Sequence, residues 1–563
     1  MSSSVTPHPT LVHAFLHWAR TTPDAVYMTQ PLPGGQVQQF TWRECADQVQ
    51  RMAAHLASLG LPRGSSIGLL GRNSAHWILT DLAIWLAGHV SVPLYPTLNG
   101  ESAAYILEHA EVKLLFLGKL DGIADGWKDI STVLPAALPL ISLPLSPRKD
   151  VPQWTDSIAS TQPRGDLPLP QPDELATIVY TSGSTGRPKG VMHSFGTMVS
   201  VAGSLRDTYH VTNQERMLSY LPLAHVAERA VLETSSLYFG FKVFFSEGLE
   251  TFQQDLQRAQ PTIFFSVPRL WTKFYLAVNE KLPPKKQKIL FRIPLLSGVV
   301  KRKVLKQLGL DQVRLAITAS APLPPTIMQW YRDLGLELLD VYGMTENFGY
   351  SHGSRPGEVR VGYVGHCNPG VVCRIAENGE VQVKSPGQMT GYYKNPEKTA
   401  EDMTADGFLK TGDRGEIDAQ GRLKITGRVK ELFKTSKGKY VAPVPIEQKL
   451  NRHPKVEVIC VTGPSQPQPF ALLMLSPDAQ AELGRQQLNR DDLTGEFGAL
   501  LKEVNDSLED HEKLDYLVVV KDQWTMENGY LTPTMKIKRN IIEDRYLPQA
   551  DAWVSQRQTV IWE

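Results

Sequence analysis

A ten-residue stretch rich in glycines, hydroxyls and cations is the clearest chemical feature of the sequence. It reads Thr181-Ser-Gly-Ser-Thr-Gly-Arg-Pro-Lys189-Gly190 and follows the apolar segment 176–180 directly. Glycines let backbone N–H groups turn toward an anion, hydroxyls add donors, and Arg187 or Lys189 offsets phosphate charge. The Walker A pattern GxxxxGK[ST] cannot be laid on these positions. We therefore predict a polyphosphate-binding loop of another kind, in preference to a flexible linker.

Carboxylates and one further cation follow in three short segments. Glu346 closes the segment Tyr342-Gly-Met-Thr-Glu, Asp413 closes Thr-Gly-Asp, and Arg428 follows Gly427. A carboxylate in a turn is usually a solvated surface acid, but carboxylates are also the hard oxygen ligands that Mg²⁺ takes. Two carboxylate oxygens can equally accept hydrogen bonds from paired hydroxyls.

Two more candidates have ordinary explanations when taken alone. Lys536 stands among apolar and basic residues in the segment 531–539, as on a solvated strand face. His225 stands among Leu223, Ala224 and Val226, as expected for a hydrogen-bonded core histidine. Local sequence gives neither residue a catalytic role.

Together these segments resemble the adenylate-forming enzymes, which include acyl-CoA synthetases, luciferases and the adenylation domains of peptide synthetases. The phosphate loop of that family reads TSG[ST]TGxPKG, and residues 181–190 fit it at every specified position. Five further segments fit in the family's order, so the resemblance spans roughly residues 177–539. The segment 221–229, LPLAHVAER, is similar to the long-chain fatty-acid branch.

The resemblance implies a role for each matching residue. Lys536 is implied to be the adenylation lysine, Thr345 to contact the α-phosphate, and Glu346 to hold Mg²⁺ together with Thr181. His225 is implied either to line the mouth of the acyl tunnel or to position the carboxylate. Lys430 is implied to be the hinge between two half-reactions. The residues implied to bind ATP are Thr181, Ser182, Gly183, Ser184, Thr185, Gly186, Lys189, Tyr342, Gly343, Asp413 and Arg428.

The activity that this resemblance implies is a ligase reaction. A medium- to long-chain fatty acid would attack ATP to give acyl-AMP and pyrophosphate, and coenzyme A would then displace AMP. ATP, Mg²⁺ and coenzyme A are thus the expected cofactor and co-substrates. The alternatives are an acyl-AMP ligase that loads a carrier protein, an aryl- or other acid–CoA ligase, a luciferase-like oxygenase, and a nucleotide-binding pseudoenzyme.

Composition limits the partners. The 59 Lys and Arg nearly balance 58 Asp and Glu in 563 residues, so no overall field favours nucleic acid. The four cysteines lack CxxC spacing, which indicates a reducing compartment, and the polar start of the sequence has no apolar signal segment. We expect a cytoplasmic protein that binds small molecules and forms a homodimer.

The stretch 281–306, with nine basic residues and no acid, is a candidate for peripheral contact with an inner membrane surface.

Helices alternating with apolar strands must position these residues. Thr41 and Glu44 have capping-box spacing at the start of an amphipathic helix that ends near Gly60. We expect an α/β protein with a large N-terminal domain of mostly parallel sheets and covering helices, a β-barrel-like subdomain, and a small mobile C-terminal α/β domain.

The expected domains are 1–429 for ATP and acyl binding and 430–563 for the mobile part. The proline-rich stretch 135–172 is expected to be a surface connector between subdomains. The predicted strands are 67–70, 90–92, 112–117, 176–180, 262–267, 313–318, 336–341, 456–461, 470–475 and 516–520.

Overall fold

The computed structural model describes residues 8–120, 126–181, 187–291, 293, 296–321, 323–526, 528–532 and 536–563. The chain forms two compact units, each of which has its own core. Unit 1 comprises Met1–Ala321, Ile327–Cys373 and Val383–Leu409, and unit 2 comprises Pro322–Thr326, Arg374–Gln382 and Lys410–Glu563. This division reflects compactness, whereas the expected boundary at 429/430 concerns motion. That boundary therefore stays a prediction.

Unit 1 is built around a seven-stranded sheet. Its strand order is β18 (Gly391–Tyr392), β8 (Lys189–Ser194), β7 (Leu175–Thr181), β4 (Val90–Leu94), β3 (Ser66–Leu70), β5 (Leu114–Leu117) and β6 (Leu140–Ser142). The strands from β7 to β6 are parallel, whereas β8 and β18 run antiparallel to their neighbours. In β5, Leu114 and Phe116 enter one core, and Leu115 and Leu117 enter the other. Because both faces are covered, these strands are apolar at nearly every position.

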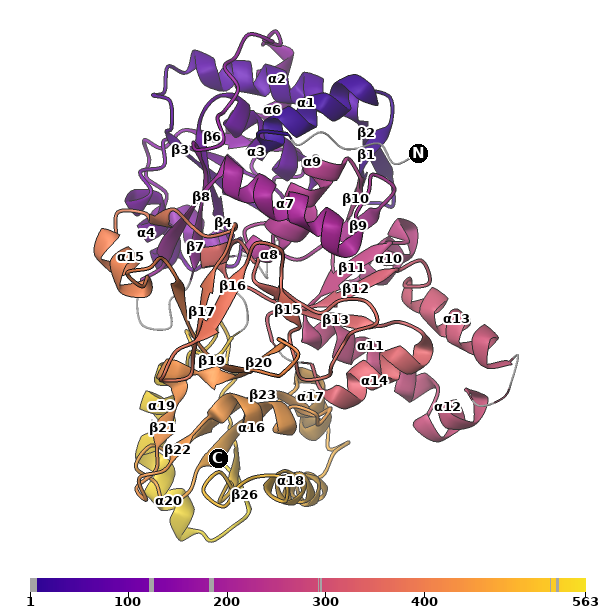
Figure 1. The fold of residues 1–563 in the computed structure, drawn as a ribbon, viewed down its shortest axis with the longest axis vertical. Helices are drawn as coiled ribbons and strands as arrows, with labels where there is room; N and C mark the ends of the chain where they lie inside the picture. Colours follow the sequence, from indigo (N-terminus) through magenta and orange to yellow (C-terminus); the bar gives the residue numbers. More distant parts are fainter. Residues whose placement is uncertain are drawn as a thin grey trace. The chain divides into compact units, whose positions relative to one another are not determined.

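Helix α3 (Ala75–Leu86) lies in the larger of the two cores. Every residue of α3 is buried, including the polar residues His76, Thr80 and Asp81. The predicted capping box begins α2 (Trp42–Ser58), where the Thr41 side chain accepts from the Glu44 N–H and the Glu44 carboxylate accepts from the Thr41 N–H. Figure 1 shows α2 near α1 (Leu11–Thr21) and α6 (Trp154–Ala159) at the top of the view.

Two smaller sheets complete unit 1. One has the order β2 (Val37–Thr41), β1 (Val26–Pro31), β10 (Lys242–Phe245) and β9 (Arg216–Ser219). The other has the order β11 (Ile263–Ser266), β12 (Leu315–Thr318), β13 (Leu338–Tyr342), β14 (His352–Gly353) and β15 (His366–Cys367). In the second sheet β11 to β13 are parallel, and β14 and β15 are antiparallel.

Further helices cover these sheets. They are α4 (Gly100–His109), α5 (Trp127–Val133), α7 (Phe195–Tyr209), α8 (Val226–Glu228), the π-helix η1 (Arg229–Thr234), α9 (Ser235–Phe239), α10 (Phe252–Ala259), α11 (Pro268–Lys281), α12 (Pro284–Leu290), α13 (Leu296–Leu308), α14 (Pro325–Leu334), the 3-10 turn η2 (Thr345–Asn347) and α15 (Pro396–Asp402).

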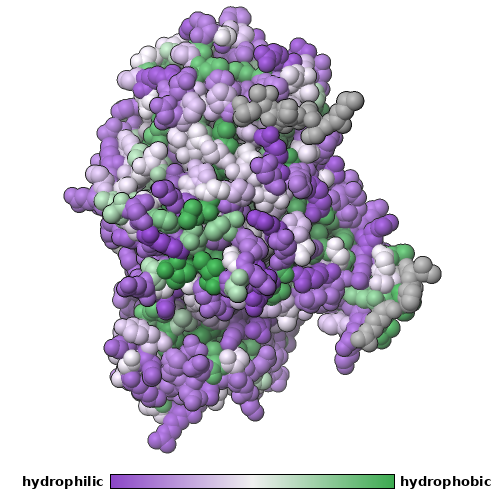
Figure 2. Space-filling model, in the orientation of Figure 1, coloured by the Kyte–Doolittle hydropathy of each residue, from purple (hydrophilic) through white to green (hydrophobic). Residues whose placement is uncertain are grey.

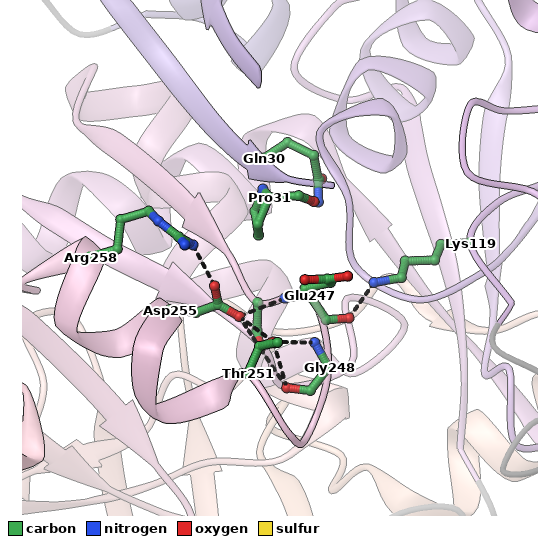
Figure 3. A network of polar contacts seen from close by, with 9 residues as sticks. Gln30, Pro31, Lys119, Glu247, Gly248, Thr251, Asp255 and Arg258 are labelled. Atoms are coloured by element: carbon green, nitrogen blue, oxygen red, sulfur yellow. Dashed lines mark hydrogen bonds and ion pairs between the residues drawn. The ribbon is translucent and has the colours of Figure 1, made fainter. Parts of the chain in front are cut away.

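A polar network ties the end of β5 to the loop after β10 (Figure 3). Lys119, which is buried, donates from its ammonium group to the carbonyl of Glu247. The carboxylate of Asp255 on α10 accepts from the Glu247 N–H at 2.9 Å and from the Thr251 hydroxyl at 2.8 Å. Arg258 forms an ion pair with the same carboxylate. These contacts link segments that follow strands of two different sheets, and they give the buried lysine and the buried aspartate their polar partners.

The prediction that residues 135–172 connect two subdomains is wrong. The stretch does not join separate subdomains, because β5 before it and β7 after it belong to one seven-stranded sheet, and part of the stretch is itself regular structure. β6 extends the seven-stranded sheet, and α6 buries Trp154, whose indole N–H donates to Gln48 of α2 at 3.1 Å. The prolines hid both elements because packing against α2 and β5 overrides weak local propensity.

Unit 2 holds a four-stranded sheet with the order β23 (Val456–Thr462), β24 (Phe470–Leu475), β25 (Leu517–Val519) and β26 (Val560–Trp562). Alternate residues of β24 enter two cores, with Leu473 on one face and Leu472 on the other. The first face is covered by α16 (Pro443–Leu450), α17 (Pro477–Gly484) and α18 (Arg490–Asn505), and the second by α19 (Arg539–Tyr546) and α20 (Ala550–Ser555).

A further four-stranded sheet is formed within residues 372–428. Its order is β16 (Val372–Ile375), β17 (Glu380–Lys384), β19 (Leu409–Ile417) and β20 (Leu423–Arg428). The 3-10 turn η3 (Val429–Glu431) and the hairpin of β21 (Phe433–Lys434) and β22 (Tyr440–Val441) follow, and η4 (Leu547–Gln549) joins α19 to α20. Within the described part of the chain, none of the helices is long and apolar enough to cross a membrane.

Candidate functional site

The predicted phosphate loop starts and ends on paired strands of unit 1. Thr181 is the last residue of β7 and lies opposite Lys189, the first residue of β8. Residues Ser182, Gly183, Ser184, Thr185 and Gly186 lie outside the described residues. Gly190 is required by close packing, because an added Cβ would lie 2.7 Å from Ile178 and 3.1 Å from the Tyr180 ring.

A tight turn follows β13 and carries Thr345 and Glu346. Tyr342 ends β13, and Gly343 packs so closely on Gly349 that a Cβ would lie 2.3 Å from its backbone. The Asn347 side chain accepts from the Met344 N–H at 2.9 Å, which closes the turn. The turn is therefore held rigidly by its own residues, and Gly343 admits no larger side chain.

Tyr392 connects the turn to the phosphate loop. Its hydroxyl donates to Glu346 Oε1 at 2.9 Å and lies 3.0 Å from an oxygen of Asp402. Lys189 Nζ lies 5.2 Å from the centre of the same ring, a cation–π contact. Burial, and then the charges of Glu346 and Asp402, raise the pKa of Tyr392, so the hydroxyl stays protonated and keeps donating. One tyrosine thus contacts two of the residues that the sequence singled out.

His193 holds the backbone of the turn that carries Thr345 and Glu346. This buried histidine on β8 donates from Nε2 to the carbonyl of Thr345 at 2.8 Å, and its ring lies 4.9 Å from that of Phe348. Burial lowers the pKa of His193 to about 4. The ring is therefore neutral at pH 7, and with its proton on Nε2 it fixes the backbone of Thr345.

Sequence reasoning found neither Tyr392 nor His193. Their partners lie 46 and 152 residues away in the chain, so no local pattern marks them.

His225 is half-buried and caps a short helix. Its Nδ1 accepts from the Ala227 N–H at 3.1 Å, so in the neutral ring Nε2 carries the proton. The ring lies 6.5 Å from that of Tyr95, edge to face. The structure thus gives His225 a partner, as expected for a core histidine, and leaves Nε2 as a donor.

A buried charge cluster lies directly after His225. Arg229 is fully buried; its guanidinium is 2.7 Å from Asp81 and 3.6 Å from Glu233, and it stacks over Trp77. Burial raises the pKa of Glu233 despite the nearby Arg229. Arg229 begins the π-helix η1, and π-helical turns are frequent near functional sites.

Unit 2 carries the predicted ribose-binding residues as a pair. Asp413 on β19 lies opposite Arg428 on β20, and Arg428 Nε is 3.1 Å from the Asp413 carboxylate. The Asp413 N–H donates to the Thr411 hydroxyl at 3.1 Å. Asp413 is buried and Arg428 is exposed. The Asp413 carboxylate is therefore held in place by its surroundings, whereas the Arg428 side chain has room to change its rotamer.

Lys430 and Lys536, also in unit 2, are both exposed. Lys430 is the middle residue of η3. Lys536 is held by its backbone: its N–H donates to the Thr532 hydroxyl at 3.0 Å, and its carbonyl accepts from the Thr532 N–H at 2.8 Å. Lys538, its nearest basic neighbour, is half-buried at the start of α19.

Among the described residues, no group of three His, Cys, Asp or Glu side chains is placed to hold a metal ion. Mg²⁺ usually keeps several waters and takes one or two carboxylates together with substrate phosphates. Glu346 fits that requirement as a single protein ligand, because its Oε1 is oriented by Tyr392.

Two family models match most of the chain. Residues 15–393 match the AMP-binding enzyme family, and residues 431–558 match the AMP-binding enzyme C-terminal domain. The chain is 30% identical to long-chain-fatty-acid–CoA ligase FadD15 of Mycobacterium bovis, over 98% of each chain. It is also 30% identical to human long-chain-fatty-acid–CoA ligase 1, over 86% of this chain and 78% of the human one.

Solved structures share the fold. The anthranilate–CoA ligase AuaEII, in complex with anthranoyl-AMP, aligns with a TM-score of 0.78 at 21% identity, over 98% of this chain and 100% of its own. The A-PCP didomain of carboxylic acid reductase from Segniliparus rugosus, in complex with AMP, aligns with a TM-score of 0.80 at 23% identity, over 97% and 82%. The α/β fold with a large N-terminal and a smaller C-terminal domain is thereby confirmed, and the chain belongs to the AMP-binding enzyme family.

Proposed function

We propose that this protein activates a medium- to long-chain fatty acid with ATP and transfers the acyl group to coenzyme A. The fatty-acid carboxylate attacks the α-phosphorus and pyrophosphate leaves; the coenzyme A thiol then attacks the acyl carbon and AMP leaves. The observation that carries this proposal is the match to a long-chain-fatty-acid–CoA ligase along 98% of both chains. A match of that extent includes both the predicted phosphate loop, residues 181–190, and the C-terminal part of the chain.

The first half-reaction explains the residues in and around the turn. A carboxylate is a poor acyl donor because oxide is a very poor leaving group, and coupling to AMP replaces that leaving group. Two anions must approach one another, so cations and N–H donors have to stabilise the charge of the transition state. Lys189 supplies a cation beside Tyr392, and Thr345, fixed by His193, presents a hydroxyl.

We assign the remaining roles in the same way. Tyr342 packs on adenine, Asp413 accepts from the ribose hydroxyls, and Arg428 lies beside the ribose and α-phosphate. His225, with its proton on Nε2, orients the fatty-acid carboxylate. Glu346 and Thr181 would hold Mg²⁺, which when bound offsets phosphate charge. The members of the phosphate loop are Thr181, Ser182, Gly183, Ser184, Thr185, Gly186 and Lys189, and Gly343 shapes the adenine-side turn.

The two half-reactions need different surfaces of residues 430–563. Lys536 serves adenylation, and the turn Lys437-Gly438-Lys439 borders the path of the thiol. Both are exposed in unit 2, and the Lys437 ammonium donates to Gln468 at 3.2 Å. Lys430 is the hinge about which this part reorients, a task that needs a few tolerant backbone angles.

An acid panel tests the proposed function. Purified protein is incubated with ATP, Mg²⁺ and coenzyme A and with acids of increasing chain length, an aryl acid or a dicarboxylate. We expect AMP and an acyl-CoA of the correct mass with fatty acids. Acyl-AMP without acyl-CoA, rescued by a phosphopantetheinylated carrier protein, would support the carrier-loading alternative, and light or oxygen consumption would support an oxygenase. No pyrophosphate exchange with any acid would overturn the proposal.

We further propose that the segment 281–306 contacts an anionic membrane surface. Its described cations are half-buried Lys301 and a set of exposed residues, namely Lys281, Lys285, Lys286, Lys288, Arg302, Lys303 and Lys306. Ile289 and Val299 are each 64% exposed among them, and Figure 2 shows hydrophobic side chains among hydrophilic ones where α12 and α13 lie. Exposed apolar residues beside cations suit a surface of anionic lipid, into which long-chain acids partition. We accordingly propose that the protein works in the cytoplasm, at an inner membrane surface.

Vesicle flotation tests this contact. We expect the protein to float with phosphatidylglycerol vesicles and to stay behind with phosphatidylcholine alone. Ile289→Asp with Val299→Asp should abolish flotation, whereas Leu249→Asp, at a residue 91% exposed elsewhere in unit 1, should not. Equal behaviour of the two variants would overturn the contact. Light scattering on the same samples measures whether the chain is the expected homodimer.

A further inference from the structure

Two cysteines lie on either side of a tight turn in unit 1. β15 ends at Cys367, a turn closed by the Val371 N–H donating to the Asn368 carbonyl at 3.0 Å follows, and Cys373 lies in β16. Gly370, the third residue of the turn, has φ of +78°, which suits glycine. The turn folds the chain back, so the Cys373 thiol donates a hydrogen bond to Cys367.

A buried histidine contacts the first cysteine from the neighbouring strand. His352 lies opposite Cys367 in the antiparallel pair of β14 and β15, and its Nε2 is 3.3 Å from the Cys367 sulfur. Its Nδ1 lies 2.9 Å from the hydroxyl of Ser351. When Ser351 donates to Nδ1, the proton of the ring lies on Nε2 and points at the sulfur. The Cys367 sulfur thus receives two hydrogen bonds.

The same histidine lies opposite Tyr342. His352 pairs with Tyr342 across β13 and β14, and the two rings are 6.1 Å apart. Tyr342, His352 and Cys367 are therefore neighbours across three paired strands, β13, β14 and β15. The row lies at the end of β13 from which the turn with Glu346 starts.

The four cysteines fall into two classes. The hydrogen bond from Cys373, and that from His352, lower the pKa of Cys367, whereas the pKa of Cys373 is raised, so one sulfur is the thiolate and the other the thiol. Burial raises the pKa values of Cys45 and Cys460. Cys367 and Cys373 are half-buried, and Cys45 and Cys460 are fully buried. Reaction with oxidants follows thiolate character and exposure.

We propose that Cys367 and Cys373 are a peroxide-reactive thiol pair, a modification site that closes to a disulfide beside Tyr342. The Cys367 thiolate attacks hydrogen peroxide, an S–O bond forms, the O–O bond breaks, and hydroxide leaves and is protonated to water. Cys373 then attacks the sulfenic sulfur, the S–S bond forms, and a second water leaves. Two thiols are oxidised and one peroxide is reduced.

Peptide mapping of the whole protein tests the pair directly. Trypsin releases both cysteines on one peptide, residues 361–374, whereas Cys45 and Cys460 lie on two other peptides. After brief exposure to hydrogen peroxide and alkylation of the remaining thiols, we expect the peptide 361–374 to have lost two hydrogen atoms. We expect this oxidation to be about tenfold faster, or more, than any change at Cys45 or Cys460.

Variants identify which sulfur reacts first. Cys373→Ser should accumulate a sulfenic acid at Cys367 that a cyclic 1,3-dione traps, Cys367→Ser should abolish the reaction, and Cys45→Ser should leave it unchanged. His352→Gln should slow alkylation of Cys367 at pH 6 and shift its pH profile part of the way toward that of an ordinary thiol, because the hydrogen bond from Cys373 remains. Peptide 361–374 keeping both thiols while Cys45 or Cys460 oxidises, or a disulfide between two chains, would overturn the proposal. The readout is mass alone, so it is independent of the proposed ligase activity.

Discussion

The hydroxyl of Tyr392 donates a hydrogen bond to Glu346 Oε1 at 2.9 Å. The bond joins β18, at the edge of the seven-stranded sheet, to the turn after β13 in a different sheet. The Glu346 backbone is held from the same segment, because its carbonyl accepts from the Met389 N–H at 2.8 Å. The carboxylate that we assign to Mg²⁺ is therefore oriented by a side chain that itself needs no contact with substrate.

Tyr392→Phe should slow adenylation without unfolding unit 1. Loss of a hydrogen bond to a charged group is worth about 1.5–3 kcal/mol, so we expect a fall of about 10- to 100-fold in pyrophosphate exchange and a higher Mg²⁺ requirement. Tyr393→Phe is the matched control, because Tyr393 packs on His109 and should leave the rate within about twofold. Equal rates for the two variants would show that Glu346 does not depend on Tyr392.

His193 should make stability depend on pH. Its pKa falls from 6.5 to about 4 on folding, so the unfolded chain binds a proton that the folded chain does not, and stability falls as pH drops from 6.5 toward 4. At pH 5 the loss is about 2 kcal/mol. His193→Gln should keep a donor to the Thr345 carbonyl and lose this pH dependence, whereas His193→Ala should lose both. Urea unfolding at pH 5 and pH 7 measures the difference, and an unchanged pH slope in His193→Gln would contradict it.

Asp413→Asn should weaken ATP binding, because ribose hydroxyls would lose a charged acceptor. We expect the KM for ATP to rise about 10- to 100-fold. The control is Glu416→Gln on the same two strands, where Glu416 pairs with Lys424 at 2.8 Å and both side chains are exposed. A surface pair of that kind contributes little, so the KM should change by less than about twofold. Steady-state kinetics at saturating fatty acid compares them, and similar KM values would remove Asp413 from the ribose site.

Lys430→Pro should separate the two half-reactions. Proline fixes φ near −65° and so restricts the rotation that a hinge needs. We expect transfer to coenzyme A to fall about tenfold, with adenylation much less affected, whereas Lys430→Ala should preserve both. Single-turnover assays of acyl-AMP formation and of its consumption give the two rates. A uniform loss in Lys430→Pro would place the hinge elsewhere.

Sequence reasoning succeeded where local pattern decides structure. The capping box of Thr41 and Glu44, which begins α2, follows from two residues within one turn of each other. The strand ends that carry Thr181 and Tyr342 were also predicted, because apolar runs stop there.

What the sequence could not give depends on contacts between distant segments. Tyr392 and His193 are ordinary residues until β18 and β8 bring them to the turn after β13. Arg229, the first residue of the π-helix η1, pairs with Asp81, which comes from α3. Likewise, His352 and Cys367 meet because β14 and β15 pair in one register, and shifting that register by one residue would turn the two side chains to opposite faces.

Lys536→Ala should abolish most acyl-AMP formation while leaving thioester formation from supplied acyl-AMP nearly intact. An ammonium aimed at the developing phosphate charge stabilises the adenylation transition state alone, and loss of one such donor costs about 10²- to 10³-fold in rate. Lys538→Ala is the sharp control. The two lysines share a charge and a segment, but Lys536 is exposed on a backbone fixed by Thr532, and Lys538 is half-buried where α19 begins. Rapid-quench measurement of acyl-AMP, beside thioester mass from added acyl-AMP, separates the steps. An equal loss in both steps, or the Lys536 pattern appearing in Lys538→Ala, would mean that another residue is the adenylation lysine.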